Sequence, residues 1–260
     1  MTDMRDIHPF QGMKTNHGDS LKFWDDYAEK YSSMQQGDIP ERIVARLIDI
    51  DFIDSSSAVL ELGSGPGTYS LPLARAVSSV TCMDTSPKML DRLTASAASE
   101  GIRNITPLLS DWTVFSPINR YSVCMSSLCP GTGTPESLQK MESVSKNGCV
   151  LVSWLENHGD DLTSDIWHEL GKEYGFDFRR NNPALEWLKD NGRNPAYEIF
   201  ETHITAELSL DGLIERERSA FRAYGVETDI EPIVRKLVDS DNGIVHYDAT
   251  NRMKLITWRP

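Results

Sequence analysis

The chain has 260 residues, of which 39% are hydrophobic and 25% are charged, and its formal net charge is −13 at pH 7. This composition is typical of a globular protein, and no apolar run approaches the roughly 18 residues that a membrane span needs. An acidic chain repels the phosphate backbone of nucleic acids, so neither a nucleic acid nor a membrane is an expected partner.

The N-terminal residues and the cysteines favour a cytoplasmic location. Residues 1–10 include Asp3 and Asp6 and have no basic, apolar signal region, so export is not expected. The four cysteines are Cys82, Cys124, Cys129 and Cys149. They form no Cys-x-x-Cys pair and show no zinc-ribbon spacing, so we expect neither a metal site nor a disulfide framework. Buried thiols that pack as small hydrophobic groups suit a reducing compartment.

Two helices are expected before the first strand. Residues 21–31 carry aromatic side chains mostly at helical spacing. A second helix is expected after Asp38, its predicted N-cap, with an apolar face between Ile39 and Ile48. The chain therefore enters its first strand from a helical segment.

The first strand, residues 59–62, runs directly into glycines at alternate positions, which are Gly63, Gly65 and Gly67. These glycines remove every Cβ from one side of a tight strand-to-helix turn, so the backbone and a ligand can come into contact. The dinucleotide fingerprint requires a further glycine where this chain has Thr68. The turn therefore predicts a nucleoside-cofactor site and disfavours a nicotinamide-dependent oxidoreductase.

Beyond the turn, short apolar strands alternate with amphipathic helices. The expected strands are 80–83, 105–109, 121–127 and 149–154, and the expected helices are 69–77, one that begins at Ser86 and Pro87, and one that begins at Thr134 and Pro135. This alternation indicates a parallel, doubly wound α/β sheet with right-handed crossovers. Ligands of such sheets bind beyond the carboxyl ends of the strands. Glu61, Asp84, Asp111 and Cys129 fall at those ends, which predicts one site there.

The pattern after Leu162 is looser. The expected elements are helices at 162–175 and 183–191, a strand at 197–208, helices at 210–224 and 229–239, and a closing strand at 253–258. We expect the two late strands to complete the sheet. We expect the helices between Ser209 and Ser240 to form an insertion over the cofactor crevice.

Four short motifs together resemble the class I S-adenosylmethionine-dependent methyltransferases. They are Glu61 to Gly67, the acid Asp84, Ser86 to Leu90, and the pair Asp111-Trp112. The resemblance covers about residues 20–155. It implies an α/β fold with a doubly wound, mostly parallel seven-stranded sheet, its last strand antiparallel, and S-adenosyl-L-methionine as cofactor.

The resemblance also implies the cofactor-binding residues. They are Glu61, Gly63, Ser64, Gly65, Gly67, Asp84, Thr85, Met89, Asp111, Trp112 and Tyr27. Asp84 would accept hydrogen bonds from both ribose hydroxyls, or is only a turn residue. Asp111 would accept from the adenine amino group while Met89 and Trp112 flank the base, with core packing as the alternative for Trp112. Glu61 would orient the turn or, through water, the cofactor's amino group, or has a structural role alone.

Residues 21–31 resemble the N-terminal lid of many small-molecule members of that family. In this reading Tyr27 and Tyr31 exclude water and shape the acceptor pocket, and plain core packing is the alternative. The expected organisation is a helical lid over residues 1–50, a cofactor-binding core over 51–160, and a substrate-side remainder over 161–260. These parts form one integrated domain.

The candidate catalytic residues are His158, Cys129 and Tyr31. A sulfonium is already an activated leaving group, so a general base is optional. His158 follows the fifth strand and is a base candidate or a surface histidine. Cys129 shapes the pocket, binds a soft metal or simply packs. The sequence from Ser127 to Gly131 departs from the Asn- or Asp-Pro-Pro-aromatic motif of amino-group methyltransferases, which disfavours adenine and glutamine-amide acceptors.

The sequence thus predicts a cytoplasmic S-adenosylmethionine-dependent methyltransferase that acts on a small-molecule acceptor by in-line displacement. One alternative is a non-catalytic S-adenosylmethionine-binding or regulatory protein. Another is a protein or nucleic-acid methyltransferase, which the acidic charge argues against.

Overall fold

The computed structural model of the protein describes residues 22, 24–25, 28–29, 31, 36–115, 121–129, 132–158, 162–171, 183–223 and 226–260. The helices are α2 (Ile39–Asp49), α3 (Ser70–Ala76), α4 (Pro87–Ser99), α5 (Pro135–Val144), α6 (Leu162–Glu169), α7 (Pro183–Asp190), α8 (Leu210–Ala223) and α9 (Glu231–Leu237). The strands are β1 (Ala58–Leu62), β2 (Ser79–Asp84), β3 (Ile105–Leu109), β4 (Tyr121–Ser127), β5 (Ser145–His158), β6 (Ala196–Ser209) and β7 (Ile244–Trp258). No helix within these described residues is both long and apolar enough to cross a lipid bilayer.

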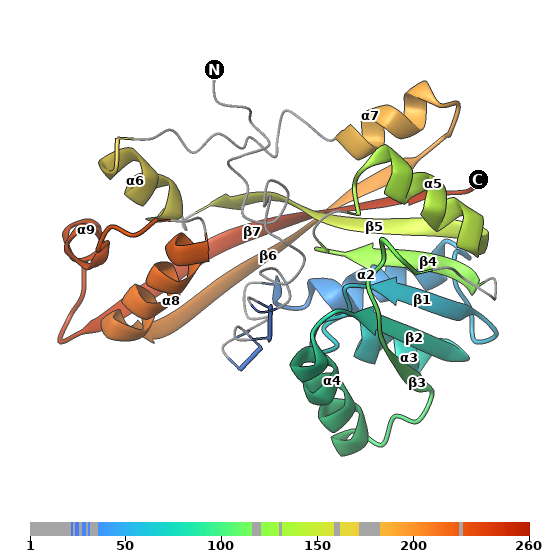
Figure 1. Ribbon diagram of the computed structural model, residues 1–260, viewed down its shortest axis with the longest axis horizontal. Coiled ribbons are helices and arrows are strands. Elements are labelled where there is room, and N and C mark those ends of the chain that lie inside the picture. The colour runs from blue at the N-terminus through green and yellow to red at the C-terminus, as the bar shows by residue number, and fades with distance from the viewer. Residues whose placement is uncertain are drawn as a thin grey trace.

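The strands form one seven-stranded sheet of order β3-β2-β1-β4-β5-β7-β6 (Figure 1). Strands β1 to β5 pair in parallel, whereas β7 runs antiparallel to both β5 and β6. The chain order reverses direction beside β1, which places a switch point between β1 and β4. The predicted doubly wound, mostly parallel seven-stranded sheet is confirmed.

Two apolar cores cover the two faces of this sheet. On one face, α2 and α3 bury residues such as Ile43 and Leu73 against β1, β2 and β4. On the other face, α5 and α7 bury residues such as Met141 and Leu188 against Leu60 and other strand residues. Because both faces of the central strands are covered, these strands read as apolar runs, and this is why they were predictable.

The predicted helix starts at Ser86 and Thr134 are confirmed, and the side chains of both residues cap their helices. The hydroxyl of Ser86 accepts a hydrogen bond from the backbone N–H of Met89 at 3.2 Å, and the hydroxyl of Thr134 accepts from that of Ser137 at 3.3 Å. Asp38 is the N-cap residue of α2 as predicted, but its side chain makes no capping hydrogen bond. Its carboxylate instead accepts from the guanidinium of Arg42, one helical turn on.

The last three strands of the sheet are longer than the sequence predicted. The expected strand at 253–258 begins instead at Ile244, and β6 pairs with β7 from Ala196 opposite Thr257 to Ser209 opposite Ile244. In β7, exposed and buried residues alternate before Ala249, whereas residues 253–258 are all buried. The missed part is therefore a two-faced strand without a continuous apolar run.

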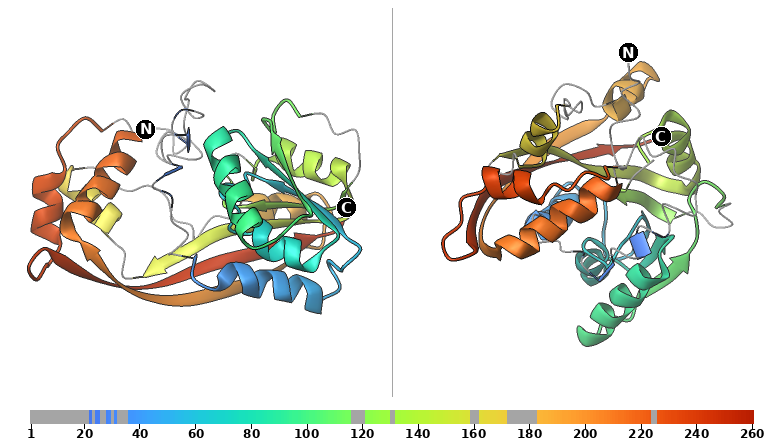
Figure 2. Two further views of the ribbon diagram at one scale, coloured as in Figure 1. Left: turned by 90° about the horizontal axis from the view of Figure 1, so that it is seen from below. Right: turned by 60° about the vertical axis from the view of Figure 1, so that its left-hand side comes forward.

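The long strands carry a third apolar core away from the first two. Helices α6, α8 and α9 pack together through residues that include Ile166, Phe221 and Val234. This cluster lies at the opposite end of the long strands from α5 and the C-terminus (Figures 1 and 2). The insertion expected between Ser209 and Ser240 is helical as predicted, but it packs at this far end, and none of its described residues lines the cavity beside the glycine turn.

Candidate functional site

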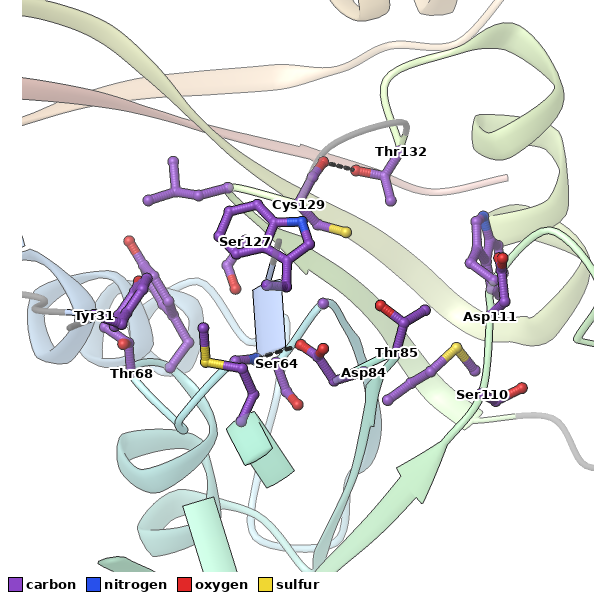
Figure 3. A pocket seen from close by; sticks show the side chains of 18 of the residues that line it. Tyr31, Ser64, Thr68, Asp84, Thr85, Ser110, Asp111, Ser127, Cys129 and Thr132 are labelled. Carbon is purple, nitrogen blue, oxygen red and sulfur yellow. Dashed lines mark hydrogen bonds between the residues drawn. The ribbon is translucent and has the colours of Figure 1, made fainter. Parts of the chain in front are cut away.

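A cavity of about 240 Å³ opens at the carboxyl ends of β1, β2, β3 and β4, beside the glycine turn (Figure 3). The described residues that line it are Trp24, Tyr31, Gln36, Gly63, Ser64, Gly65, Thr68, Tyr69, Met83, Asp84, Thr85, Met89, Ser110, Asp111, Trp112, Thr113, Ser127, Leu128, Cys129 and Thr132. Of the predicted cofactor residues, Gly63, Ser64, Gly65, Asp84, Thr85, Met89, Asp111 and Trp112 lie on this wall. The cavity thus stands where a parallel sheet places its ligand.

The three glycines of the turn have different neighbours. All have positive φ, at 64° for Gly63, 52° for Gly65 and 97° for Gly67. A Cβ on Gly63 would lie 2.4 Å from the sulfur of Cys129, and one on Gly67 would lie 3.3 Å from the Leu93 side chain. A Cβ on Gly65 would meet no protein atom within 4 Å. Only Gly65 therefore leaves its space open to a ligand, while the other two make room for protein packing.

This difference predicts that alanine at Gly65 mainly weakens ligand binding, whereas alanine at Gly63 mainly lowers the stability of the fold. Gly65→Ala should lower the free energy of unfolding only by the cost of a left-handed alanine, about 1–2 kcal/mol, yet weaken S-adenosylhomocysteine binding about tenfold or more. Gly63→Ala should lower the free energy of unfolding further, because its Cβ overlaps Cys129. Denaturant unfolding and calorimetry measure both quantities. The double variant Gly63→Ala/Cys129→Gly should recover part of the lost stability, and an unaltered loss would contradict this account of Gly63.

Asp84 ties the end of β2 to the glycine turn. Its Oδ2 accepts a hydrogen bond from the N–H of Gly65 at 2.8 Å, and its Oδ1 accepts from the N–H of Ser86 at 2.9 Å. Burial raises the pKa of Asp84, while the donated backbone hydrogen bonds oppose that increase. Each carboxylate oxygen has a second lone pair, so the group can accept further hydrogen bonds from a ligand.

The end of β3 supplies a second acid and an indole. Asp111 Oδ1 accepts hydrogen bonds from the N–H of Thr113 at 2.6 Å and from its hydroxyl at 2.8 Å. The indole N–H of Trp112 donates to the hydroxyl of Ser137 at 2.8 Å, and the ammonium of Lys140 lies 4.6 Å from the indole centroid. The Trp112 ring is thus fixed against α5 and still lines the cavity.

Glu61 is fully buried beneath the turn and does not line the cavity. Its carboxylate accepts hydrogen bonds from the hydroxyl of Ser70 at the start of α3 and, at 2.7 Å, from that of Ser127 at the end of β4. Burial raises the pKa of Glu61 to about 7, and the two serine hydroxyls oppose that increase. Glu61 therefore joins β1, α3 and β4 beneath the site.

Cys129 packs over the turn because the backbone bends after β4. Leu128 has a φ of 52°, and its N–H donates to the carbonyl of Val152 at 3.0 Å. The bend returns Cys129 to Gly63. Burial, followed by the negative charges of Asp84 and Glu61, raises the pKa of the Cys129 thiol to about 12. This shift disfavours the thiolate, which is the form of cysteine that acts as a nucleophile or binds a metal.

The described residues contain no group of three or more histidine, cysteine, aspartate or glutamate side chains that could hold a metal ion. The candidate base His158 ends β5, where its backbone pairs with Thr250. It lies six residues beyond Val152, which pairs with Ser127, so the strand carries it about 20 Å along from the cavity. Its side chain is outside the described residues.

The described part of residues 21–31 approaches the cavity. Trp24 and Tyr31 line it, and the Tyr31 hydroxyl accepts a hydrogen bond from the side-chain amide of Gln36 at 3.2 Å. The Asp25 carboxylate accepts from the Ser86 hydroxyl at 3.0 Å. Tyr27, predicted to contact the cofactor, lies outside the described residues.

Several wall residues were not predicted. Ser110, Ser127, Leu128 and Thr132 adjoin predicted strand ends, and Thr68 and Tyr69 directly follow the glycine turn. Their positions next to these elements were a usable signal. Nothing in the sequence near Gln36 indicates that it lines the cavity. Its position depends on the packing of the next residue, Gly37, against Thr202 on β6, which is remote in the sequence.

Sequence comparisons identify a domain and one relative. Residues 59–148 match a protein-family model described as a methyltransferase domain. An uncharacterised protein of Haemophilus influenzae is 24% identical over 216 residues, which cover 77% of this chain and 79% of that protein. The matched range spans the strands from β1 into β5 and contains the glycine turn, Asp84 and Asp111.

Solved structures similar to this one include two that are described as methyltransferases. A candidate methyltransferase from Bacillus halodurans C-125 has a TM-score of 0.52 at 15% identity, with 83% of this chain and 97% of that chain covered. A magnesium protoporphyrin IX methyltransferase from Synechocystis PCC 6803, with bound SAH (S-adenosylhomocysteine), has a TM-score of 0.49 at 14% identity, with 98% and 93% covered. Residues 59–148, which match the methyltransferase-domain model, thus lie in a seven-stranded sheet in which β7 runs antiparallel to its neighbours, and the chain contains a methyltransferase domain.

Proposed function

We propose that this enzyme transfers the methyl group of S-adenosylmethionine to a small, uncharged molecule bound in the cavity beside the glycine turn. The observation that carries the proposal is the cavity's two unlike ends. Asp84 and Asp111 supply carboxylates suited to a nucleoside, whereas the wall around Tyr31 is aromatic and uncharged. Each end therefore offers suitable contacts to one of the two reactants.

The residues of the turn fit the cofactor. Gly65 leaves open space beside the backbone. The hydroxyl of Ser64 is buried and has no hydrogen-bond partner among the described residues. A buried hydroxyl without a partner costs about 1–3 kcal/mol, which a polar ligand group would recover. These two features support a ligand with polar groups that lies against the turn.

We assign the cofactor's nucleoside to the end of the cavity formed by Asp84, Thr85, Met89, Asp111 and Trp112, called here the nucleoside end. Asp84 would accept from the ribose hydroxyls and Asp111 from the adenine amino group. Met89 and the fixed indole of Trp112 would flank the base. Glu61 would act from below by holding the elements that carry the turn.

The opposite end, formed by Tyr31, Gln36, Thr68, Tyr69 and Leu128, is called here the acceptor end. Tyr31 and Thr68 lie on the opposite side of Asp84 from Ser110 and Asp111 (Figure 3). None of the side chains that define the acceptor end is charged. With a chain charge of −13, this supports a small neutral acceptor in preference to a nucleic acid.

When bound, S-adenosylmethionine supplies a methyl group on a sulfonium, which needs no further activation. The task of the protein is then to align the acceptor with that methyl group and to exclude water, an effect worth up to about 7–11 kcal/mol. Tyr31 and the protonated thiol of Cys129 shape the wall in this proposal. His158, a candidate base from the sequence, lies about 20 Å along β5 from the cavity and has no part in this proposal, because a base must reach the proton that it removes.

Calorimetric titration with S-adenosylmethionine and S-adenosylhomocysteine tests the cofactor assignment, and methyl transfer from labelled S-adenosylmethionine to a panel of neutral small molecules tests the activity. We expect saturable binding of both ligands and labelled product from a subset of the panel. Absence of binding would refute the proposal. Methyl transfer is also assayed with a small protein and with RNA as acceptors. Cofactor binding without transfer to any of these acceptors would favour the regulatory alternative.

We further propose a cytoplasmic location. All four cysteines lie within the described residues, and none forms a disulfide. Cys82, Cys124 and Cys149 are fully buried among apolar side chains. Thiols kept reduced in this way suit a reducing compartment.

A further inference from the structure

One polar side chain at the acceptor end remains unexplained by protein contacts. Gln36 is only 4% exposed and lines the cavity. Its amide nitrogen donates to the Tyr31 hydroxyl at 3.2 Å. Its amide oxygen, Oε1, is buried and has no hydrogen-bond partner among the described residues. A buried carbonyl oxygen in this state is costly, so it requires a partner from outside the described residues, such as a water, an ion or a ligand group.

The backbone holds Gln36 in place. The next residue, Gly37, has a φ of 52°, and a Cβ there would lie 2.5 Å from the hydroxyl of Thr202 on β6. Gln36 is therefore attached to a backbone that is pressed directly onto the sheet, one turn before α2. The Tyr31 contact then fixes the amide, so that Oε1 is not simply one end of a mobile surface side chain.

The position of Gln36 in the cavity indicates whether it contacts the cofactor or the methyl acceptor. The nucleoside end is set by the carboxyl ends of β2 and β3, at one edge of the sheet. Gln36 lies toward the other edge, because Gly37 packs on β6 and Tyr69, on the same wall, donates to the sulfur of Met253 on β7. An adenosyl cofactor that extends from the nucleoside end along the turn leaves this region for the second reactant.

We propose that Gln36 is a specificity-determining residue whose Oε1 accepts a hydrogen bond from an N–H or O–H group of the methyl acceptor. The inference rests on the proposed function and narrows the acceptor to a small, largely apolar molecule with at least one such donor. The rings of Tyr31 and Tyr69 and the side chain of Leu128 supply its apolar contacts. Without a donor, binding leaves Oε1 buried and unsatisfied, so acceptors that lack one are rejected.

The test compares matched probes on the protein saturated with S-adenosylhomocysteine. Phenol has one O–H donor that anisole lacks, and aniline has two N–H donors that N,N-dimethylaniline lacks. Calorimetry or ligand-observed NMR at millimolar concentration measures the four affinities. We expect each donor to bind the wild type about 5- to 10-fold more tightly than its methylated partner. Gln36→Met, which keeps the length of the side chain and removes the amide, should reduce both ratios to about one.

Two control variants separate recognition of the acceptor from other effects. Gln36→Glu keeps an oxygen acceptor and should retain a preference for the donors, which an effect of side-chain packing alone would not produce. Ser64→Ala should weaken S-adenosylhomocysteine binding and leave the probe ratios unchanged. Thermal unfolding checks that each variant is folded.

The outcomes distinguish this inference from the proposed function beneath it. If the wild type fails to bind S-adenosylhomocysteine, both are refuted. If it binds S-adenosylhomocysteine but does not bind the donors, or binds both members of each pair equally, only the role of Gln36 is refuted. A loss of S-adenosylhomocysteine affinity in Gln36→Met, with the probe ratios retained, would show that Oε1 contacts the amino-acid part of the cofactor and would also overturn the inference.

Discussion

Replacing Asp84 with alanine is expected to weaken S-adenosylhomocysteine binding about 100-fold. The carboxylate would make two charge-assisted hydrogen bonds to the ribose hydroxyls, each worth about 1.5–3 kcal/mol, and every 1.4 kcal/mol changes affinity tenfold. Burial already raises the pKa of Asp84, so the structure bears the cost of placing an acid here before any ligand arrives. Isothermal titration calorimetry on both proteins measures the change. Equal affinities would remove the ribose assignment.

The same substitution also removes the hydrogen bonds that Asp84 accepts from Gly65 and Ser86, so a weaker affinity alone does not isolate the ribose contact. A comparison of adenosine with 2′,3′-dideoxyadenosine does isolate it. The wild type should prefer adenosine strongly, and Asp84→Ala should bind the two nucleosides nearly equally. A preference that survives the substitution would place the ribose recognition elsewhere and leave Asp84 as an anchor for the turn.

The sequence predicted those parts of the fold in which local pattern and tertiary burial agree. Strands β3 and β4 match their expected limits, 105–109 and 121–127. The helix starts at Ser86 and Thr134 were predictable because each of these residues precedes a proline that opens a helix. The extension of β7 from Ile244 could not be predicted from a local pattern. One face of this part of the strand is exposed, and the strand forms only by pairing with β6, which ends 35 residues earlier in the chain.

The site divides in the same way. Asp84, Asp111 and Gly65 follow predicted strands, so their approach to one cavity could be inferred from the parallel sheet. The position of Gln36 could not, because it depends on contact between Gly37 and Thr202, which are remote in the chain. Nor could the sequence show that Gly63 makes room for Cys129. The motif does not distinguish one glycine from the next. The atoms packed around each glycine in the folded protein determine whether it makes room for a ligand or for another side chain.

Glu61 provides a pH-dependent prediction for stability. Its pKa is about 7 in the folded protein, against an ordinary value of 4.5, because the carboxyl is fully buried. Below pH 4.5 the group is protonated in both the folded and the unfolded states. Between pH 4.5 and 7 the unfolded chain loses this proton first, so the free energy of unfolding falls as the pH rises. The difference of 2.5 units corresponds to about 3 kcal/mol, fully lost above pH 7.

Glu61→Gln removes this titration and keeps a polar group that can bond to Ser70 and Ser127. We expect the variant to gain up to about 3 kcal/mol in unfolding free energy over the wild type between pH 4.5 and pH 8, as measured by urea unfolding across that range. Other titrating groups are common to both proteins and cancel in the difference. Glu201→Gln, at an exposed ion pair with Arg252, is the matched control and should show no comparable trend. A wild-type and Glu61→Gln difference that stays constant with pH would mean that Glu61 is ionised in the folded protein throughout, held so by its two serine donors.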